Sequence, residues 1–180
     1  MTRYLIPAAA FLFLAACSGN DEPPPANDTQ AAPSGAALKT REGADVGMVT
    51  LSEDANGVTV KVEAAGLEPG AHGLHLHTVG RCDGPGFDSA GPHWNPTAKQ
   101  HGRDNPDGAH LGDLANLDIG EDGRGTSTFL VGGATLTGTT NPLLDLDGAA
   151  LVVHAKADDY KTDPSGASGD RIACAVLTAN

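Results

Sequence analysis

The stretch His72-Gly-Leu-His-Leu-His77 alternates apolar and polar residues over the length of a short β-strand. Residues two apart on a strand project from the same face, so His75 and His77 present two imidazoles together while Leu76 points to the other face. Imidazole is a common ligand of both copper and zinc. The stretch therefore predicts a strand that holds part of a metal site, against the ordinary alternative of two exposed strand histidines.

The segments around this stretch have the composition of short strands bounded by turn residues. The predicted strands are residues 46–51, 58–62, 74–79, 114–119, 125–131, 149–154 and 172–177, and Asn56-Gly57 predicts a tight turn between the first two. After the leader, no ten-residue segment has a helical apolar stripe. Many short strands at near-regular spacing favour an all-β fold, an antiparallel sandwich or barrel.

Two long irregular stretches separate the predicted strands, residues 80–112 and 155–170. Loops of this length within one small domain are usually functional. The first contains three histidines, and the second follows directly after His154. We therefore expect the chemistry of the protein to lie on loops that a rigid sheet holds in place.

The histidines divide into two donor sets that share one ring. Copper accepts three or four imidazole nitrogens, and zinc suits a tetrahedral set of nitrogens with a carboxylate oxygen. The predicted copper set is His75, His77, His93 and His154, and the predicted zinc set is His93, His101, His110 and Asp113. One imidazole has two nitrogens, so His93 is able to join both sets. A zinc set closed by four protein ligands leaves no place for substrate, which makes zinc structural.

The N-terminus has the pattern of a targeting segment. Residues 1–16 combine Arg3 with a short apolar core, which predicts a signal peptide too short to remain as a membrane anchor. Leu14-Ala-Ala-Cys17 resembles a bacterial lipobox and implies a lipid on Cys17; a plain secretory cut after Ala16 is the alternative. Residues 17–37 are Pro/Ala-rich and almost free of large apolar side chains, which predicts a disordered tether ahead of a domain at 38–180.

The charge of the chain excludes several partners. Its formal net charge is −12, and removal of residues 1–16 takes away only Arg3, which leaves a charge near −13. A chain with this negative charge is repelled by nucleic acid and by an anionic membrane surface. A small anionic substrate would need a local positive region to overcome the overall field.

Two cysteines remain beyond Cys17. Export to an oxidising compartment makes a Cys82–Cys174 disulfide the expected state, and two separate thiols are the alternative. A disulfide between Cys82 and Cys174 closes a loop of about ninety residues, which stabilises the fold by roughly 4–5 kcal/mol in the chain-entropy model.

Six motifs in this chain resemble those of the copper/zinc superoxide dismutase family, in the family's order, over about residues 38–180. They are His72-Gly-Leu-His-Leu-His77, Gly91-Pro-His-Trp-Asn-Pro96, His101-Gly, His110-Leu-Gly-Asp113-Leu, Leu151-Val-Val-His-Ala-Lys-Ala-Asp-Asp159 and Gly169-Asp-Arg-Ile-Ala-Cys174. The resemblance implies an eight-stranded antiparallel Greek-key barrel, an immunoglobulin-like sandwich with two long functional loops. It also implies disproportionation of superoxide to dioxygen and hydrogen peroxide by a redox-cycling copper beside a structural zinc.

The resemblance assigns the same copper and zinc ligands as the two sets above, with His93 as the bridge that couples electron and proton transfer. Asp158 matches an acid that orients ligands of both metals, although a simple turn acid is the alternative. Arg171 matches an arginine beside the copper channel that holds the substrate anion; a surface arginine paired with Asp170 is the alternative. Cys82 and Cys174 match the family's disulfide. We assign the leftover His72 to hydrogen bonding inside the barrel.

Three functional questions stay open in the sequence. Lys161 is our choice for the cation that steers superoxide, with an ordinary surface lysine as the equal alternative. A homodimer is possible, but the pairing face is not predicted. The leading hypothesis is a lipid-anchored, exported superoxide dismutase that protects the bacterial cell envelope. A copper or zinc carrier on the same scaffold is the rival hypothesis, and Arg171 argues against it because a carrier has no need of an anion-binding residue.

Overall fold

The computed structural model describes residues 34–179. The predicted signal peptide, the lipid site Cys17 and the tether up to residue 33 lie outside the described residues. The strands are β1 (Ser34–Thr40), β2 (Asp45–Asp54), β3 (Gly57–Ala65), β4 (Gly70–His72), β5 (Leu74–His77), β6 (Leu117–Ile119), β7 (Arg124–Gly132), β8 (Ala149–His154) and β9 (Arg171–Leu177), with a single 3-10 turn η1 (Asp88–Ala90) in this part of the chain. The all-β prediction is confirmed.

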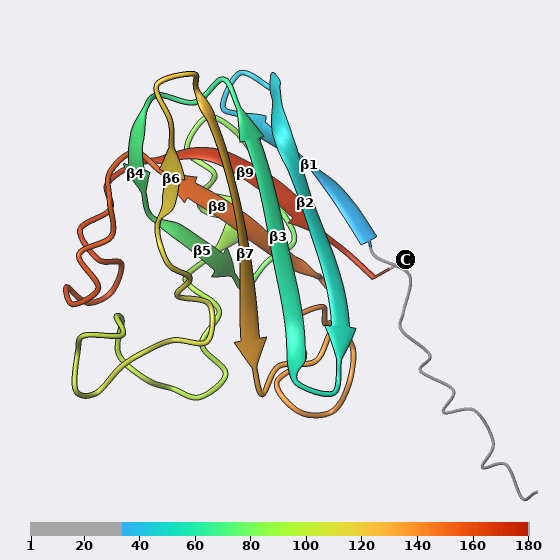
Figure 1. Ribbon diagram of the computed structural model, residues 1–180. Helices are drawn as coiled ribbons and strands as arrows, with labels where there is room; N and C mark the ends of the chain where they lie inside the picture. The colour runs from blue at the N-terminus through green and yellow to red at the C-terminus, as the bar shows by residue number, and fades with distance from the viewer. Residues whose placement is uncertain (1–33, 180) are drawn as a thin grey trace, which may run out of the picture.

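The strands form a sheet that curls almost into a ring. Seven strands pair in the order β5-β8-β9-β1-β2-β3-β7, and β4 pairs with β6. The turn 120–123 joins β6 to β7, with Gly120 donating its N–H to Arg124 O at 2.8 Å. β4 runs directly into β5 through Gly73, so the ring closes from β7 through β6 and β4 to β5. Figure 1 shows the two layers of this barrel, with β5, β8 and β9 behind the long strands β1, β2, β3 and β7.

The barrel agrees with the predicted antiparallel Greek-key fold, and two boundaries differ. The stretch predicted as one strand from residue 74 is preceded by β4, which pairs on the opposite side, so the described chain has nine strand segments where eight were expected. The chain changes pairing partner at Gly73, where a Cβ would lie 2.7 Å from the Cβ of Ser168, so glycine lets the loop 155–170 approach this point. The domain begins before residue 38: Ser34–Ala37 pair with β2, since an extended Gly/Ala segment completes a ladder without large side chains.

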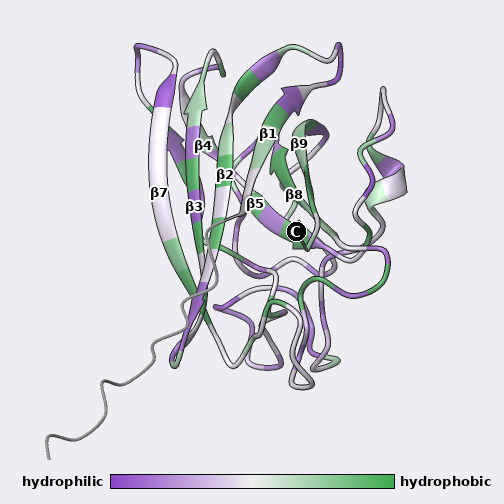
Figure 2. Ribbon diagram, turned by 90° about the vertical axis from the view of Figure 1, so that its right-hand side faces the viewer, coloured by the Kyte–Doolittle hydropathy of each residue, from purple (hydrophilic) through white to green (hydrophobic). Residues whose placement is uncertain are grey.

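Apolar side chains on alternate positions fill the barrel. In β3, Val58, Val60 and Val62 are fully buried and Lys61 is exposed, an alternation that Figure 2 shows along the strand. Every residue of β8 is buried, because β8 is covered on both of its faces. Burial of each Val or Leu contributes about 1.5–3 kcal/mol relative to exposure. The core therefore fixes the backbone of β5 and β8, the strands on which His75, His77 and His154 lie.

The predicted long loops are present, together with a third one. Residues 78–116 connect β5 to β6, residues 155–170 connect β8 to β9, and both lie on the same side of the barrel (Figure 1). Residues 133–148 form an unpredicted loop at the lower end of β7, where the Leu136 N–H donates to Glu53 Oε2 at 2.8 Å. Among residues 34–179, none forms a helix that could cross a membrane.

Candidate metal centre

The loop 78–116 runs along the edge of β5 that β8 leaves free. Leu76 donates its N–H to Gly112 O at 2.9 Å, and its carbonyl accepts the N–H of Trp94 at 2.7 Å. Two isolated bridges follow from this pairing, His75 opposite Asp113 and His77 opposite His93. Backbone pairing therefore brings loop donors that are far away in sequence to the side of the two strand histidines.

Four buried imidazoles form the first group, and they are the predicted copper set. Nitrogens of His75, His77, His93 and His154 all lie within 4.8 Å of one another, an arrangement that could hold a metal ion. In each ring one buried nitrogen has no hydrogen-bond partner: Nδ1 of His75 and Nε2 of the other three. Four unpartnered buried nitrogens facing one point would be costly without a ligand, because buried polar groups normally make hydrogen bonds.

The opposite nitrogens of the three strand histidines donate to fixed acceptors. His77 Nδ1 donates to Gly91 O at 2.8 Å, His154 Nδ1 to Gly169 O at 3.1 Å, and His75 Nε2 to Asp158 Oδ2 at 2.8 Å. Each such bond places the proton on the outer nitrogen and leaves a lone pair on the inner one. Burial lowers the pKa of His75 to about 3, of His77 to about 2 and of His154 to about 4. These rings are therefore neutral and ready to coordinate a metal at neutral pH.

The second group is centred on one carboxylate oxygen. Asp113 Oδ1 lies 2.9 Å from His93 Nδ1, 3.1 Å from His101 Nδ1 and 3.0 Å from His110 Nδ1. Donors about 2.0–2.1 Å from a tetrahedral zinc lie roughly 3.3 Å from one another, so these spacings suit that ion. His93 contributes Nδ1 here and its unpartnered Nε2 to the first group. The ring thus lies between the two groups, as the sequence predicts for a bridge.

The fourth donor of the second group needs a choice between two histidines. By mutual distance, the group that lies within 4.8 Å contains His75, His93, His101 and Asp113, and it leaves out His110. We favour His110 on chemistry, because its Nδ1 contacts the same carboxylate oxygen as the other two rings. Both nitrogens of His75 are already committed, Nε2 to Asp158 and Nδ1 to the first group.

The second group differs from the first because it holds a protonated histidine beside an ionised carboxylate. Burial opposes a charged His101, but hydrogen bonds to Asp113 and Asp158 outweigh it and raise the pKa of this ring to about 9. Burial likewise opposes a charged Asp113, but hydrogen bonds from His101, His110 and His93 hold the pKa of its carboxyl far below the usual range. The group therefore keeps an ionised carboxylate and a proton that a zinc ion would have to displace.

Asp158 joins the two groups. Its Oδ2 accepts from His75 Nε2 at 2.8 Å and its Oδ1 accepts from His101 Nε2 at 3.0 Å. Burial opposes ionisation, but these two bonds lower the pKa of the Asp158 carboxyl. Asp158 does hold its own turn, since its Oδ1 accepts the Tyr160 N–H at 2.6 Å, but it is not a simple turn acid, because its buried carboxylate also contacts one ring of each group.

Sequence reasoning missed the residues that hold Asp158. Asn116 makes reciprocal bonds to its backbone, accepting from Asp158 N at 2.8 Å and donating to Asp158 O at 3.1 Å. Gly166 has φ +65°, and a Cβ there would lie 1.8 Å from Asp158 Oδ1, so only glycine leaves room for the contact with His101. The glycine between Ser165 and Ala167 was a weak signal by itself, because the sequence does not show that the loop turns back to bring it against Asp158 and His101.

Arg171 is fixed beside the first group. It donates from Nη1 to Phe87 O at 2.7 Å and from Nη2 to Gly91 O at 2.8 Å. The Gly91 carbonyl also accepts from His77 Nδ1, so the guanidinium and this ring share an acceptor. The predicted alternative, a surface arginine paired with Asp170, does not hold, because the ion pair of Asp170 is with Arg41.

The predicted disulfide is present and anchors this loop. Cys82 is bonded to Cys174 of β9, and Phe87 packs against the pair. The prediction for His72 is also confirmed, since its Nδ1 lies 2.7 Å from His154 O and its Nε2 lies 2.9 Å from Glu68 O. Both nitrogens of His72 are thus used inside the barrel.

Comparison with known proteins gives the same result as the donor geometry. Residues 46–177 match the family model for copper/zinc superoxide dismutase. The chain is 43% identical to the copper/zinc superoxide dismutase of Caulobacter vibrioides over 79% of this chain and 83% of that protein. It is also 43% identical to a superoxide dismutase-like protein of Bacillus subtilis, over 79% of this chain and 74% of that one.

Solved structures extend the similarity to the fold. A superoxide dismutase-like protein from Bacillus subtilis superposes with a TM-score of 0.77 at 40% identity, covering 81% of this chain and all of that one. The copper/zinc superoxide dismutase from Brucella abortus superposes with a TM-score of 0.61 at 29% identity, covering 81% and 99% of the two chains. With these matches and two adjoining donor groups joined by His93, the chain belongs to the copper/zinc superoxide dismutase family of enzymes, whose cofactors are copper and zinc.

Proposed function

We propose that this chain disproportionates superoxide to dioxygen and hydrogen peroxide at the cell envelope, with copper in the first donor group and zinc in the second. The observation that carries the proposal is the set of four buried, unpartnered nitrogens, one each on His75, His77, His93 and His154. Neutral imidazoles in this number suit copper. When bound, copper supplies the redox chemistry, because it accepts an electron from one superoxide and returns an electron to the next.

The residues around the first group handle the anion and the proton. Arg171 carries a permanent charge, and its two bonds to the Phe87 and Gly91 carbonyls fix the guanidinium next to the ring of His77. It therefore holds a small anion beside the group. His93 Nε2 has no hydrogen-bond partner in the protein, so whenever it is not bound to copper it can hold a proton and deliver it to the reduced product. Asp113 fixes the other side of this ring at Nδ1.

The second group acts as a structural and electrostatic support. His93, His101, His110 and Asp113 supply three nitrogens and one oxygen, a donor set that zinc prefers and that leaves no position open for substrate. Asp158 transmits the orientation of His101 to His75, because one carboxylate accepts from both rings.

The cellular setting rests on the N-terminal sequence. The predicted signal peptide and the predicted lipid on Cys17 would tether the domain to the bacterial envelope, with the domain facing the periplasm or the exterior. There it would remove superoxide near the membrane. Lys161 is exposed at the rim of the loop 155–170 and is the proposed steering cation. A homodimer is part of the proposal, and analytical ultracentrifugation tests it.

A metal carrier without turnover is the second candidate function. The neutral first group by itself favours it, because such a group would bind copper whether or not turnover followed. Arg171 favours the enzyme, because a carrier has no need of an anion-binding residue fixed beside its metal site.

Superoxide decay measured with the purified protein, loaded with copper and zinc, separates these two functions. We expect fast decay that depends on copper, and almost none in an Arg171→Ala, His154→Ala double variant. Tight binding of both metals with decay no faster than in buffer would overturn the dismutase proposal and support the carrier.

A further inference from the structure

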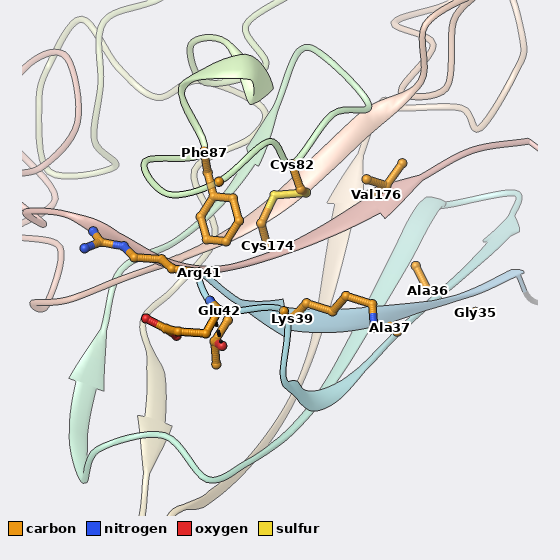
Figure 3. Close-up of a pocket in the computed structure, with 13 residues that line it drawn as sticks. Gly35, Ala36, Ala37, Lys39, Arg41, Glu42, Cys82, Phe87, Cys174 and Val176 are labelled. Atoms are coloured by element: carbon orange, nitrogen blue, oxygen red, sulfur yellow. Dashed lines mark hydrogen bonds between the residues drawn. A yellow bond between two sulfur atoms is a disulfide. The ribbon is translucent and has the colours of Figure 1, made fainter.

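Arg41 lies outside every motif that points to the family, yet it contacts the segment that carries Arg171. It begins the turn between β1 and β2, and its Nε donates a 2.6 Å hydrogen bond to the carbonyl oxygen of Arg171. Its Nη2 lies 3.3 Å from Oδ2 of Asp170. Arg41 lines a cavity of about 520 Å³ next to the disulfide, and in Figure 3 its guanidinium extends beyond Phe87, away from the end of this cavity where Val176 lies. The backbone bond fixes this charge next to Asp170.

Arg41 also lines a second cavity, of about 410 Å³, together with Asp170 and Arg171. The charged residues of this cavity are two arginines and two aspartates: Arg41, Arg171, Asp88 and Asp170. The lining is therefore neutral overall with Arg41 and carries one net negative charge without it. A negative lining would repel a small anion from Arg171, and the chain as a whole already carries a formal charge of −12.

We propose that Arg41 is a positioning residue for anion binding at Arg171, which it serves by neutralising Asp170. The inference rests on the proposed function, because it takes superoxide as the anion that Arg171 holds. The Asp170 side chain is 79% exposed and the Arg41 side chain 32% exposed, so the pair acts through a field that salt screens. Its effect on anion binding is therefore greatest at low ionic strength.

The test uses the full chain, loaded with copper and zinc, as wild type, Arg41→Met, Asp170→Asn and the double variant. Two readouts are taken at ionic strengths of about 0.01 M and about 1 M: kcat/KM for superoxide, and the affinity for azide from the visible absorption of the bound copper. The matched control is the ion pair Lys61–Glu63 on β3, which lies three strands away from β9 in the sheet. Its two charged groups are 3.0 Å apart, and the side chains of Lys61 and Glu63 are 46% and 51% exposed. Substitutions at this pair remove the same charges far from Arg171. Lys61→Met and Glu63→Gln are made in the same way.

We expect Arg41→Met to lower both kcat/KM and azide affinity about threefold at low ionic strength and hardly at all at high ionic strength. Asp170→Asn raises both about twofold, and the double variant returns to the wild-type level, because its lining is again neutral overall. The proposal is overturned if Arg41→Met matches Lys61→Met, or if the double variant stays as weak as Arg41→Met. Metal content and thermal unfolding are measured for each variant.

Two further outcomes keep the result decisive. If Arg41→Met does not fold, Asp170→Asn decides alone, and unchanged azide affinity in that variant overturns the proposal. If the wild-type protein shows no superoxide decay, the proposed function fails, while the azide titrations still establish or overturn the effect of Arg41 on anion binding.

Discussion

The two donor groups share His93 but differ in charge. In the first group, burial keeps His75, His77 and His154 neutral, with pKa values of about 3, 2 and 4. The second group is built on an ionised carboxylate, Asp113, and holds a proton on His101 through a pKa of about 9. A neutral set tolerates an ion whose charge changes, because it adds no fixed charge of its own. A set with a carboxylate favours an ion of constant double charge.

Removal of one donor from each group gives the largest effect. His154→Ala takes away a nitrogen that only the first group uses, and we expect superoxide decay to fall more than about a hundredfold, since changes in residues that merely support a ligand already cost 10–100-fold. His110→Ala weakens the second group and leaves all four first-group nitrogens in place. Metal analysis after dialysis checks this: His154→Ala keeps zinc and loses copper, and His110→Ala does the reverse. Loss of both metals from both variants would show that the groups are not separate.

Asp158→Ala tests the link between the groups. Alanine accepts from neither ring, so we expect copper and zinc affinities to fall together, each about 10–100-fold. Competition titrations with chelators measure both affinities. The neighbouring Asp159→Ala is the matched control, because the Asp159 side chain accepts only from residues of its own turn, Lys161 and Thr162. A change in one affinity alone would contradict the role of Asp158 as a shared support.

The pH dependence of metal binding should also differ between the groups. With a pKa of about 9, His101 is charged at pH 7 in the metal-free protein, so zinc must displace its proton. Zinc affinity therefore rises about tenfold for each pH unit up to pH 9, whereas copper affinity stays nearly flat above about pH 5 because those rings are already neutral. Calorimetry in buffers of different ionisation enthalpy measures the proton released on zinc binding. Zinc uptake at pH 7 without proton release would contradict this account.

Lys161→Met gives the smallest expected effect. Lys161 is exposed and contacts neither group, so its loss should lower kcat/KM about twofold at low ionic strength and leave both metal affinities unchanged. Stopped-flow decay at two salt concentrations measures the change, with Lys61→Met as the control. Equal rates for the two variants would show that Lys161 is an ordinary surface lysine.

The predictable part of the site lay in residues whose chemistry is local. His75 and His77 share a face by strand geometry alone. His110 and Asp113 are three residues apart, so the His110 ring can reach the Asp113 carboxylate within one turn of the chain. The supporting residues were not predictable in this way. Asn116, Gly166 and Arg41 have ordinary sequence surroundings. Asn116 contacts Asp158, which lies 42 residues away, and Arg41 contacts Asp170, which lies farther still. Gly166 is near Asp158 in sequence, but only the fold of the loop shows that the two touch.

The sequence by itself determined the all-β class, most of the strands, the four-histidine donor set and the pairing of Cys82 with Cys174, because strand periodicity and metal chemistry depend on residue type and local spacing. It did not predict β1 or β4. Only the tertiary structure decided where the domain begins, how the ring closes through Gly73, and which residues orient the donors. It also decided that Asp170 pairs with Arg41 and leaves Arg171 to the metal centre. The physical reason is that charge pairing and close packing depend on distance in space, which the order of residues along a chain does not contain.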